Sequence, residues 1–103
     1  MNNEKGLTQE EIFSALEKHS DILRKYKVKR IGLFGSFIRG EQTQKSDIDF
    51  LVEFKEPTFD NFMDLVFYLE ELFQRRVELI TNGNLSPYMQ PYVDKEVKWY
   101  GAS

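Results

Sequence analysis

The stretch from residue 28 to residue 54, VKRIGLFGSFIRGEQTQKSDIDFLVEF, contains both the central folding pattern of this chain and its most reactive side chains. Its first seven residues are mostly apolar and predict a strand. Gly35 ends that strand, and Ser36 is placed to cap a short helix that runs to about Arg39. A polar loop follows, and the chain then returns as a second strand.

The second strand is predicted over residues 47–54, where polarity alternates from one residue to the next. One face consists of Ile48, Phe50, Val52 and Phe54, and the other of Asp47, Asp49, Leu51 and Glu53. This alternation is typical of a strand with one buried face. The two aspartates therefore point the same way, about 6.6 Å apart along the strand at ~3.3 Å per residue.

Asp47 and Asp49 raise the question of what allows two carboxylates to lie so close together. Like charges at this spacing repel each other unless a cation lies between or beside them. Two Mg²⁺ ions, bridged by carboxylate and phosphate oxygens, would relieve that repulsion. The pair alone is weak evidence for a metal site, because Asp-x-Asp at the start of a strand can simply be a solvated loop edge.

The Gly35-Ser36 pair suggests what a metal ion would accompany. A strand that turns at a glycine into a helix leaves backbone N–H groups free, and these can hold phosphate oxygens together with the Ser36 hydroxyl. Arg39 adds a cation one turn later. The simpler alternative is a helix cap followed by a surface arginine. The other common phosphate-binding and hydrolase motifs do not occur in this chain.

Upstream, Thr8 and Glu11 have the spacing of a capping box, which predicts the start of a helix over about residues 9–26. Its apolar face consists of Ile12, Ala15, Leu16, Ile22, Leu23 and Tyr26. These positions recur at three- and four-residue steps, as expected for an amphipathic helix. We interpret His19, on or beside this stripe, as a packed or hydrogen-bonded histidine rather than a metal ligand.

Downstream of Pro57, residues 59–74 predict a second long helix. Its expected core stripe is Phe62, Val66, Leu69 and Phe73, and its wider apolar face adds Phe59, Met63 and Phe67. A face this wide indicates either a helix that is buried on most sides or a helix that presents a surface to a partner.

A third strand is predicted over residues 75–81, with Glu78 on the face opposite Val77 and Leu79. After an NGN turn, Ser86 and Pro87 suit the start of a last helix that runs toward residue 100, with Pro91 breaking its first turn. The resulting order of elements predicts an α/β or α+β fold, in which helices flank a small mixed β-sheet.

Length and composition limit the possible functions. At 103 residues, 41% hydrophobic and 30% charged, the chain is expected to form one globular domain over residues 1–103. A formal net charge of −3 argues against direct DNA binding and against an anionic membrane surface. The lack of cysteine excludes disulfides and thiolate metal sites and fits a cytoplasmic protein. Met1 to Gly6 lack the apolar core of a signal peptide.

Together these features form a specific pattern: a Gly-Ser pair, ten further residues and then Asp-Ile-Asp, with strands on both sides. The pattern resembles the signature of the DNA polymerase beta-like nucleotidyltransferase superfamily. The longer stretch GLFGSFIRGEQTQKSDIDFLVEF resembles that of the minimal nucleotidyltransferases, called MNT proteins. The resemblance continues through RRVELIT and the last predicted helix, so it covers nearly the whole chain.

The resemblance implies a role for each residue of the pattern. Gly35 and Ser36 would hold the nucleoside triphosphate, ATP, with Arg39 nearby. Asp47 and Asp49 would bind two Mg²⁺ ions. The family's third carboxylate, on a neighbouring strand, corresponds to Glu78 and would help deprotonate the attacking hydroxyl.

Glutamate at position 78 departs from the more common aspartate of the family. Its extra methylene group displaces the carboxylate by about one bond length, and a misplacement of ~1 Å can reduce a rate about 100-fold. Metal binding is therefore better supported than fast catalysis. The alternative for Glu78 is a solvated strand glutamate without a role in the site.

The resemblance also implies a partner, because the chain lacks the added domains that hold an acceptor in larger relatives. MNT proteins commonly pair with an all-helical HEPN-domain toxin, and some of them attach AMP to one of its tyrosines as antitoxins. The acceptor would then come from such a partner or from a homo- or hetero-oligomer. Two alternatives remain: an antitoxin that neutralises its partner by contact alone, and a transferase for a small molecule or a tRNA end.

Overall fold

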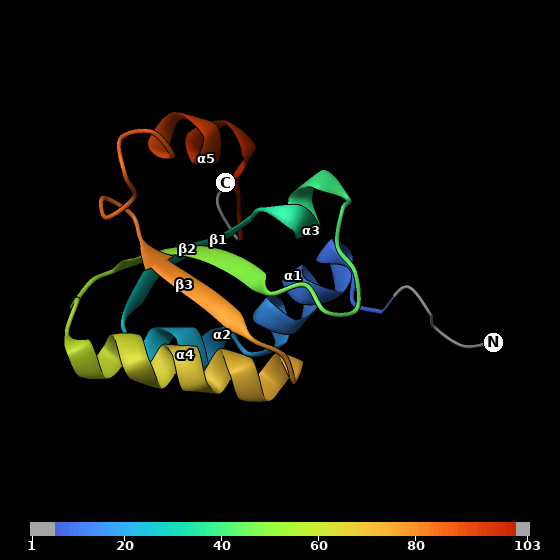
Figure 1. The fold of residues 1–103 in the computed structure, drawn as a ribbon. Coiled ribbons are helices and arrows are strands. Elements are labelled where there is room, and N and C mark those ends of the chain that lie inside the picture. Colours follow the sequence, from blue (N-terminus) through green and yellow to red (C-terminus); the bar gives the residue numbers. More distant parts are fainter. Residues whose placement is uncertain (1–5, 101–103) are drawn as a thin grey trace.

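The computed structural model of the protein describes residues 6–100 (Figure 1). The expectation of a missing signal-peptide core at Met1 to Gly6 therefore lies, apart from Gly6, outside the described residues. Within the described part, no helix is long and apolar enough to span a membrane.

The N-terminal segment forms two helices, α1 (Gln9–Lys18) and α2 (Ser20–Lys25). The capping box is confirmed, because the Thr8 side chain accepts a bond from the Glu11 backbone N–H and the Glu11 carboxylate accepts one from the Thr8 N–H. The prediction of one continuous helix is wrong. The backbone leaves the helical region at His19, with φ −113° and ψ 28°.

His19 also has the hydrogen-bonding role that the sequence suggested. Its Nδ1 lies 2.7 Å from the hydroxyl group of Tyr68, a residue 49 positions further along the chain. The two rings meet edge to face with centroids 5.8 Å apart. This contact anchors the break between α1 and α2 to the rest of the fold.

Four strands form one mixed sheet in the order β3-β2-β1-β4. The strands are β1 (Val28–Phe34), β2 (Ile48–Phe54), β3 (Val77–Thr81) and β4 (Lys98–Trp99). β2 is antiparallel to β1 and parallel to β3, and β4 is antiparallel to β1. The predicted small mixed sheet with flanking helices is therefore confirmed.

Residues 6–100 contain three further helices: α3 (Ser36–Arg39), α4 (Phe59–Phe73) and α5 (Gln90–Glu96). The last helix is much shorter than predicted. Pro91 stands in its first turn, where a missing N–H costs nothing, rather than breaking it. The helix ends at Glu96 because Val97 is extended, which lets the unpredicted strand β4 pair with β1.

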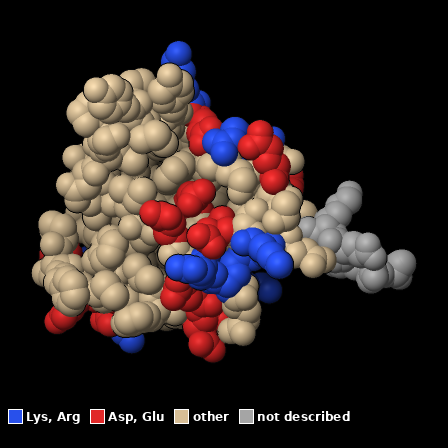
Figure 2. Space-filling view, in the orientation of Figure 1, with Lys and Arg blue, Asp and Glu red and all other residues tan. Residues whose placement is uncertain are grey.

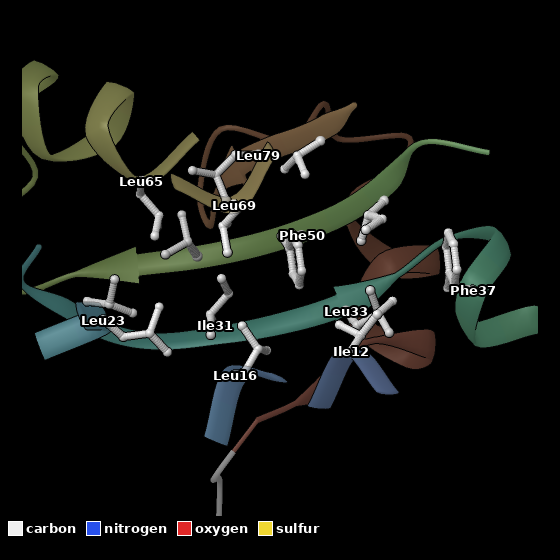
Figure 3. Packing of buried hydrophobic residues seen from close by; sticks show 14 residues of the cluster. Ile12, Leu16, Leu23, Ile31, Leu33, Phe37, Phe50, Leu65, Leu69 and Leu79 are labelled. Atoms are coloured by element: carbon white, nitrogen blue, oxygen red, sulfur yellow. The ribbon is translucent and has the colours of Figure 1, made fainter. Parts of the chain in front are cut away.

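The main core lies between one face of the sheet and the helices α1, α2 and α4 (Figures 1 and 3). Its largest fully buried side chains include Ile12, Leu16, Ile31, Leu33, Phe37, Phe50, Leu65 and Leu69. Leu65, which the predicted stripe of the second long helix omitted, is fully buried. Phe59 and Phe67 are 75% and 60% exposed, so the interpretation of this helix as buried on most sides is wrong for these two residues.

α5 covers the other face of the sheet with a smaller cluster formed by Phe34, Leu51 and Val93 (Figure 1). Leu51 was expected on the solvent face of its strand, yet it is fully buried. Side chains alternate between the two faces of β2 as predicted, but α5 covers the middle of the second face. The polar ends of that face are left to form a site beside α5.

Gly32 on β1 lies close against the segment that contains β4. A Cβ there would lie 2.7 Å from Val97 Cγ2 and 3.0 Å from Trp99 Cε3. We expect Gly32→Ala to lower the free energy of unfolding by about 1–3 kcal/mol through overpacking. Urea denaturation measures this loss. Adding Val97→Ala removes the contacted methyl group and should recover part of the stability; no recovery would contradict the close packing.

Candidate active site

The turn after β1 depends on the glycine at position 35. Gly35 has φ 82° and ψ −150°, a conformation that side chains on L-residues disfavour. A Cβ at this position would overlap the Asp49 Oδ2 atom and lie 3.0 Å from Asp49 Cγ. The backbone therefore passes directly against the Asp49 carboxylate, which only glycine permits.

The short helix α3 starts one residue earlier than the sequence suggested. Gly35 is the residue before its first turn, and its carbonyl accepts bonds from the N–H groups of Ile38 and Arg39 at 3.0 and 3.1 Å. Gly35 rather than Ser36 is the N-cap, and Ser36 is the first residue of the helix, so the prediction of a serine cap is wrong. Gly40, in the left-handed region with φ 75°, ends the helix as predicted.

The sheet brings two of the three predicted carboxylates together. Asp49 on β2 is in register with Glu78 on the parallel neighbour β3, and with Phe34 at the end of β1. Asp47 lies one residue before β2 begins and is exposed. Figure 2 shows acidic side chains gathered near the centre of the molecular face that it draws, with basic side chains beside them.

Asp49 experiences this concentration of charge most strongly. Its pKa is raised to about 6, first by burial and then by the carboxylates of Glu78 and Asp47, with a smaller opposing effect from Arg39. Glu96 adds a further raising contribution. The chain thus holds a half-buried carboxylate in surroundings that favour either a proton or a cation next to it.

A cavity of about 570 Å³ opens over these groups, a size suited to a small-molecule ligand. It is lined by Phe34, Gly35, Arg39, Asp49, Glu78, Ile80, Met89, Tyr92, Val93 and Glu96. Four predicted site residues therefore share one cavity, while Ser36 and Asp47 do not line it. A second hollow, of about 670 Å³, lies between α4 and the far ends of β2 and β3 and contains none of the predicted residues.

Glu96, at the end of α5, is a site residue that the sequence did not indicate. The Gly35 N–H donates to its Oε2 at 2.7 Å, and Arg39 Nη1 donates to Oε1 and Oε2 at 3.1 and 3.2 Å. Arg39 Nε also donates to Glu41 Oε1 at 2.9 Å. No local pattern could reveal Glu96, because it lies 61 positions from the glycine that it contacts.

The chemistry of the predicted metal ligands fits Mg²⁺. Asp47, Asp49 and Glu78 supply hard carboxylate oxygens, the donors that this ion prefers. The pKa of Asp49 is raised first by burial and then by repulsion from Glu78 and Asp47. Among residues 6–100, however, no group of three or more His, Asp or Glu side chains already has an arrangement that could hold a metal ion. Backbone register places Asp49 and Glu78 side by side on neighbouring strands.

Comparison with known proteins places this geometry in a family. Residues 16–100 match the model of the nucleotidyltransferase domain. The chain is 47% identical over 95 residues to a Methanocaldococcus jannaschii protein named as a candidate protein adenylyltransferase, covering 88% of this chain and 92% of that protein. It is 43% identical over 93 residues to the protein adenylyltransferase MntA of Thermococcus cleftensis, covering 88% and 94% of the two chains.

Solved structures agree with the sequence comparisons. A candidate minimal nucleotidyltransferase superposes with a TM-score of 0.75 at 29% identity, covering 89% of this chain and 95% of that one. A complex of a tri-AMPylated Shewanella oneidensis HEPN toxin with an MNT antitoxin gives a TM-score of 0.63 at 22% identity, covering 87% and 71%, a likeness of fold alone. The chain therefore belongs to the nucleotidyltransferase domain family, and it is an enzyme with the polymerase beta-like fold of the minimal nucleotidyltransferases.

Proposed function

We propose that this protein transfers AMP from ATP to a tyrosine hydroxyl group of a HEPN-type toxin and thereby acts as its antitoxin. The observation that carries the proposal is the contact of the Gly35 backbone with Asp49, in register with Glu78 at the floor of the cavity. The adenylyltransferase names of the relatives and the AMPylated toxin in the Shewanella complex support the same activity.

The phosphates of ATP would bind to the Gly35 N–H and the Arg39 guanidinium. These two donors already hold an anionic group, because both bond to the Glu96 carboxylate. Ser36, the next residue, offers its hydroxyl from the first position of α3. The donors are fixed by the backbone turn, so little reorganisation is needed when a phosphate arrives.

Asp47, Asp49 and Glu78 would hold Mg²⁺, which we expect as two ions. Bound Mg²⁺ neutralises phosphate charge and makes an acceptor hydroxyl more acidic. In the transfer, the acceptor oxygen forms a bond to the α-phosphorus, while the bond from that phosphorus to the oxygen that bridges the α- and β-phosphates breaks. Pyrophosphate leaves, and the hydroxyl proton passes to a carboxylate oxygen of Glu78.

The direct test is a reconstituted reaction of the protein with its HEPN-type partner, ATP and Mg²⁺. We expect the partner's mass to increase by one or more AMP groups, and peptide mapping to place them on a tyrosine. Omission of Mg²⁺ should prevent the increase. If AMP never appeared on the partner, the proposed activity would be wrong.

An antitoxin that acts by contact alone is the second candidate. The exposed side chains Phe59 and Phe67 on α4 favour it, because large apolar groups on a surface commonly mark a protein interface. The two candidate functions predict different effects of carboxylate substitutions on neutralisation of the toxin. Contact neutralisation should survive the loss of the carboxylates, whereas neutralisation by AMP transfer should not.

Glu78→Gln tests the role of the third carboxylate. We expect kcat for AMP transfer to fall about 100-fold, because a general base contributes at least that much. Thermal stability should not fall, since Glu78 is exposed on its strand and its charge raises the pKa of the nearby Asp49. Glu10→Gln, an equal charge change at an exposed position on α1, is the control. Unchanged kcat in Glu78→Gln would make Glu78 a solvated surface residue.

A further inference from the structure

The Glu96 carboxylate is bonded to the two groups proposed to bind the nucleotide's phosphates, the Gly35 N–H and the Arg39 guanidinium. It accepts a hydrogen bond from the Gly35 N–H at 2.7 Å and is paired with Arg39 at 3.1 Å. Its side chain is only 22% exposed, and the helix that carries it is anchored by the buried Val93. The bond from the Gly35 N–H is therefore a partly buried contact of the folded chain, whereas the pair with Arg39, whose side chain is 49% exposed, lies at the surface.

A carboxylate and a phosphate cannot share the Gly35 N–H. A backbone N–H at 2.7 Å from one acceptor has no room for a second anionic oxygen on the same axis. Both groups are negative, so the cavity would also hold them apart by charge. Glu96 already contributes to the raised pKa of Asp49, which places its charge within electrostatic reach of the other carboxylates.

We propose that Glu96 is an internal competitor of the nucleotide's phosphates and sets the affinity of the cavity for a triphosphate. This inference rests on the proposed function, in which Gly35 and Arg39 bind phosphate. Triphosphate binding displaces the Glu96 carboxylate from Gly35 and takes over Arg39. Nucleotide affinity is then the difference between two anionic ligands for the same donors.

A purely supporting role for Glu96 predicts the opposite effect. If the carboxylate only oriented Arg39 for the nucleotide, removing its charge would loosen Arg39 and weaken binding. If the carboxylate competes, removing its charge strengthens binding of any ligand that carries the phosphates. The sign of the change separates the two roles.

The experiment is calorimetric titration of the wild type and Glu96→Gln, with Mg²⁺ present, using ATP, inorganic tripolyphosphate and adenosine as separate probes. Hydrogen bonds to charged groups contribute enough for about a tenfold change in affinity. We expect Glu96→Gln to bind ATP and tripolyphosphate about tenfold more tightly, with no change for adenosine. Glu96→Ala, which leaves no acceptor for Gly35, should show the same direction.

Glu70→Gln is the matched control. Glu70 also accepts a bond from a backbone N–H, that of Val77 at 3.1 Å, but it is not among the residues that line the cavity. Its substitution removes the same charge and weakens the same kind of bond and should leave all three affinities unchanged. Melting temperatures of the variants verify that each one folds.

Equal or weaker binding of ATP by both Glu96 variants would overturn the inference. An equal gain for adenosine would also overturn it, because the cavity would then have opened rather than lost a competitor. The AMP-transfer reaction separates this from failure of the proposed function. Wild-type protein that transfers AMP while the Glu96 variants bind no better refutes only the competition, and absence of both binding and transfer in every protein refutes both.

Discussion

Replacement of both Asp47 and Asp49 by asparagine is expected to reduce AMP transfer to the partner by at least about 1,000-fold. Asparagine keeps the shape of each side chain but removes the charges that would hold Mg²⁺ and offset the triphosphate. Removal of a single stabilising group from a transition state already costs about 100- to 1,000-fold. The measurement is transfer of labelled AMP from ATP, with wild type and variant at matched concentrations.

The single substitution Asp49→Asn provides a control for folding. The folded chain raises the pKa of Asp49 to about 6, so its ionised form is disfavoured by burial and by neighbouring carboxylates. At pH 7.5 with EDTA, we expect Asp49→Asn to melt at a higher temperature than the wild type. The difference should shrink as the pH falls through 6 toward 4, because the wild-type carboxyl then becomes protonated in the folded state, which removes the cost of its charge, while it stays ionised in the unfolded chain.

The combination of greater stability and lost transfer would identify Asp49 as a residue kept for function at a cost in stability. Transfer that persists in the double variant would contradict the metal role of these aspartates. Cell protection that persists without transfer would instead favour the antitoxin that acts by contact.

Gly35→Ala is expected to abolish AMP transfer and to lower the free energy of unfolding by about 1–3 kcal/mol. The new methyl group would overlap Asp49 Oδ2 while the backbone stays at φ 82°. The Asp49 carboxylate would have to move away from the phosphate donors, or the turn would have to open. Either response separates groups that must act together.

Gly40→Ala separates backbone strain from the clash. Gly40 has φ 75°, similar to that of Gly35, but a Cβ there would meet no atom within 4 Å. We expect it to lower stability by about 1–2 kcal/mol, the cost of a left-handed residue, and to retain most of the transfer activity. Urea denaturation and the AMP-transfer assay measure the two effects. If Gly40→Ala lost transfer as completely as Gly35→Ala, strain alone would explain both.

Much of the site was accessible from local sequence. Strand alternation placed Asp47 and Asp49 on one face, and the parity of β3 placed Glu78 on the face opposite Val77 and Leu79. The Gly-Ser turn, the short α3 helix and the capping box at Thr8 depend on residues only a few positions apart. Such patterns are readable because they reflect backbone geometry that repeats within each element.

Tertiary packing decided the features for which the prediction from the sequence was wrong. His19 interrupts the first helix while its ring bonds to Tyr68, 49 positions away. Leu51 is buried because α5 folds back over the second face of the sheet. The strand β4 forms because Val97 is extended and Gly32 allows close approach.

The sequence by itself therefore determined the turn after β1, the strands on either side of it and the positions of the candidate carboxylates. Tertiary structure alone decided that Asp49 lies in register with Glu78, and that Glu96 reaches the Gly35 N–H from the end of the chain. The physical reason is the distance along the chain over which each interaction acts. Periodicity and capping act between residues a few positions apart, whereas the charge around Asp49 is set by side chains that only the packed sheet and α5 bring within a few ångströms.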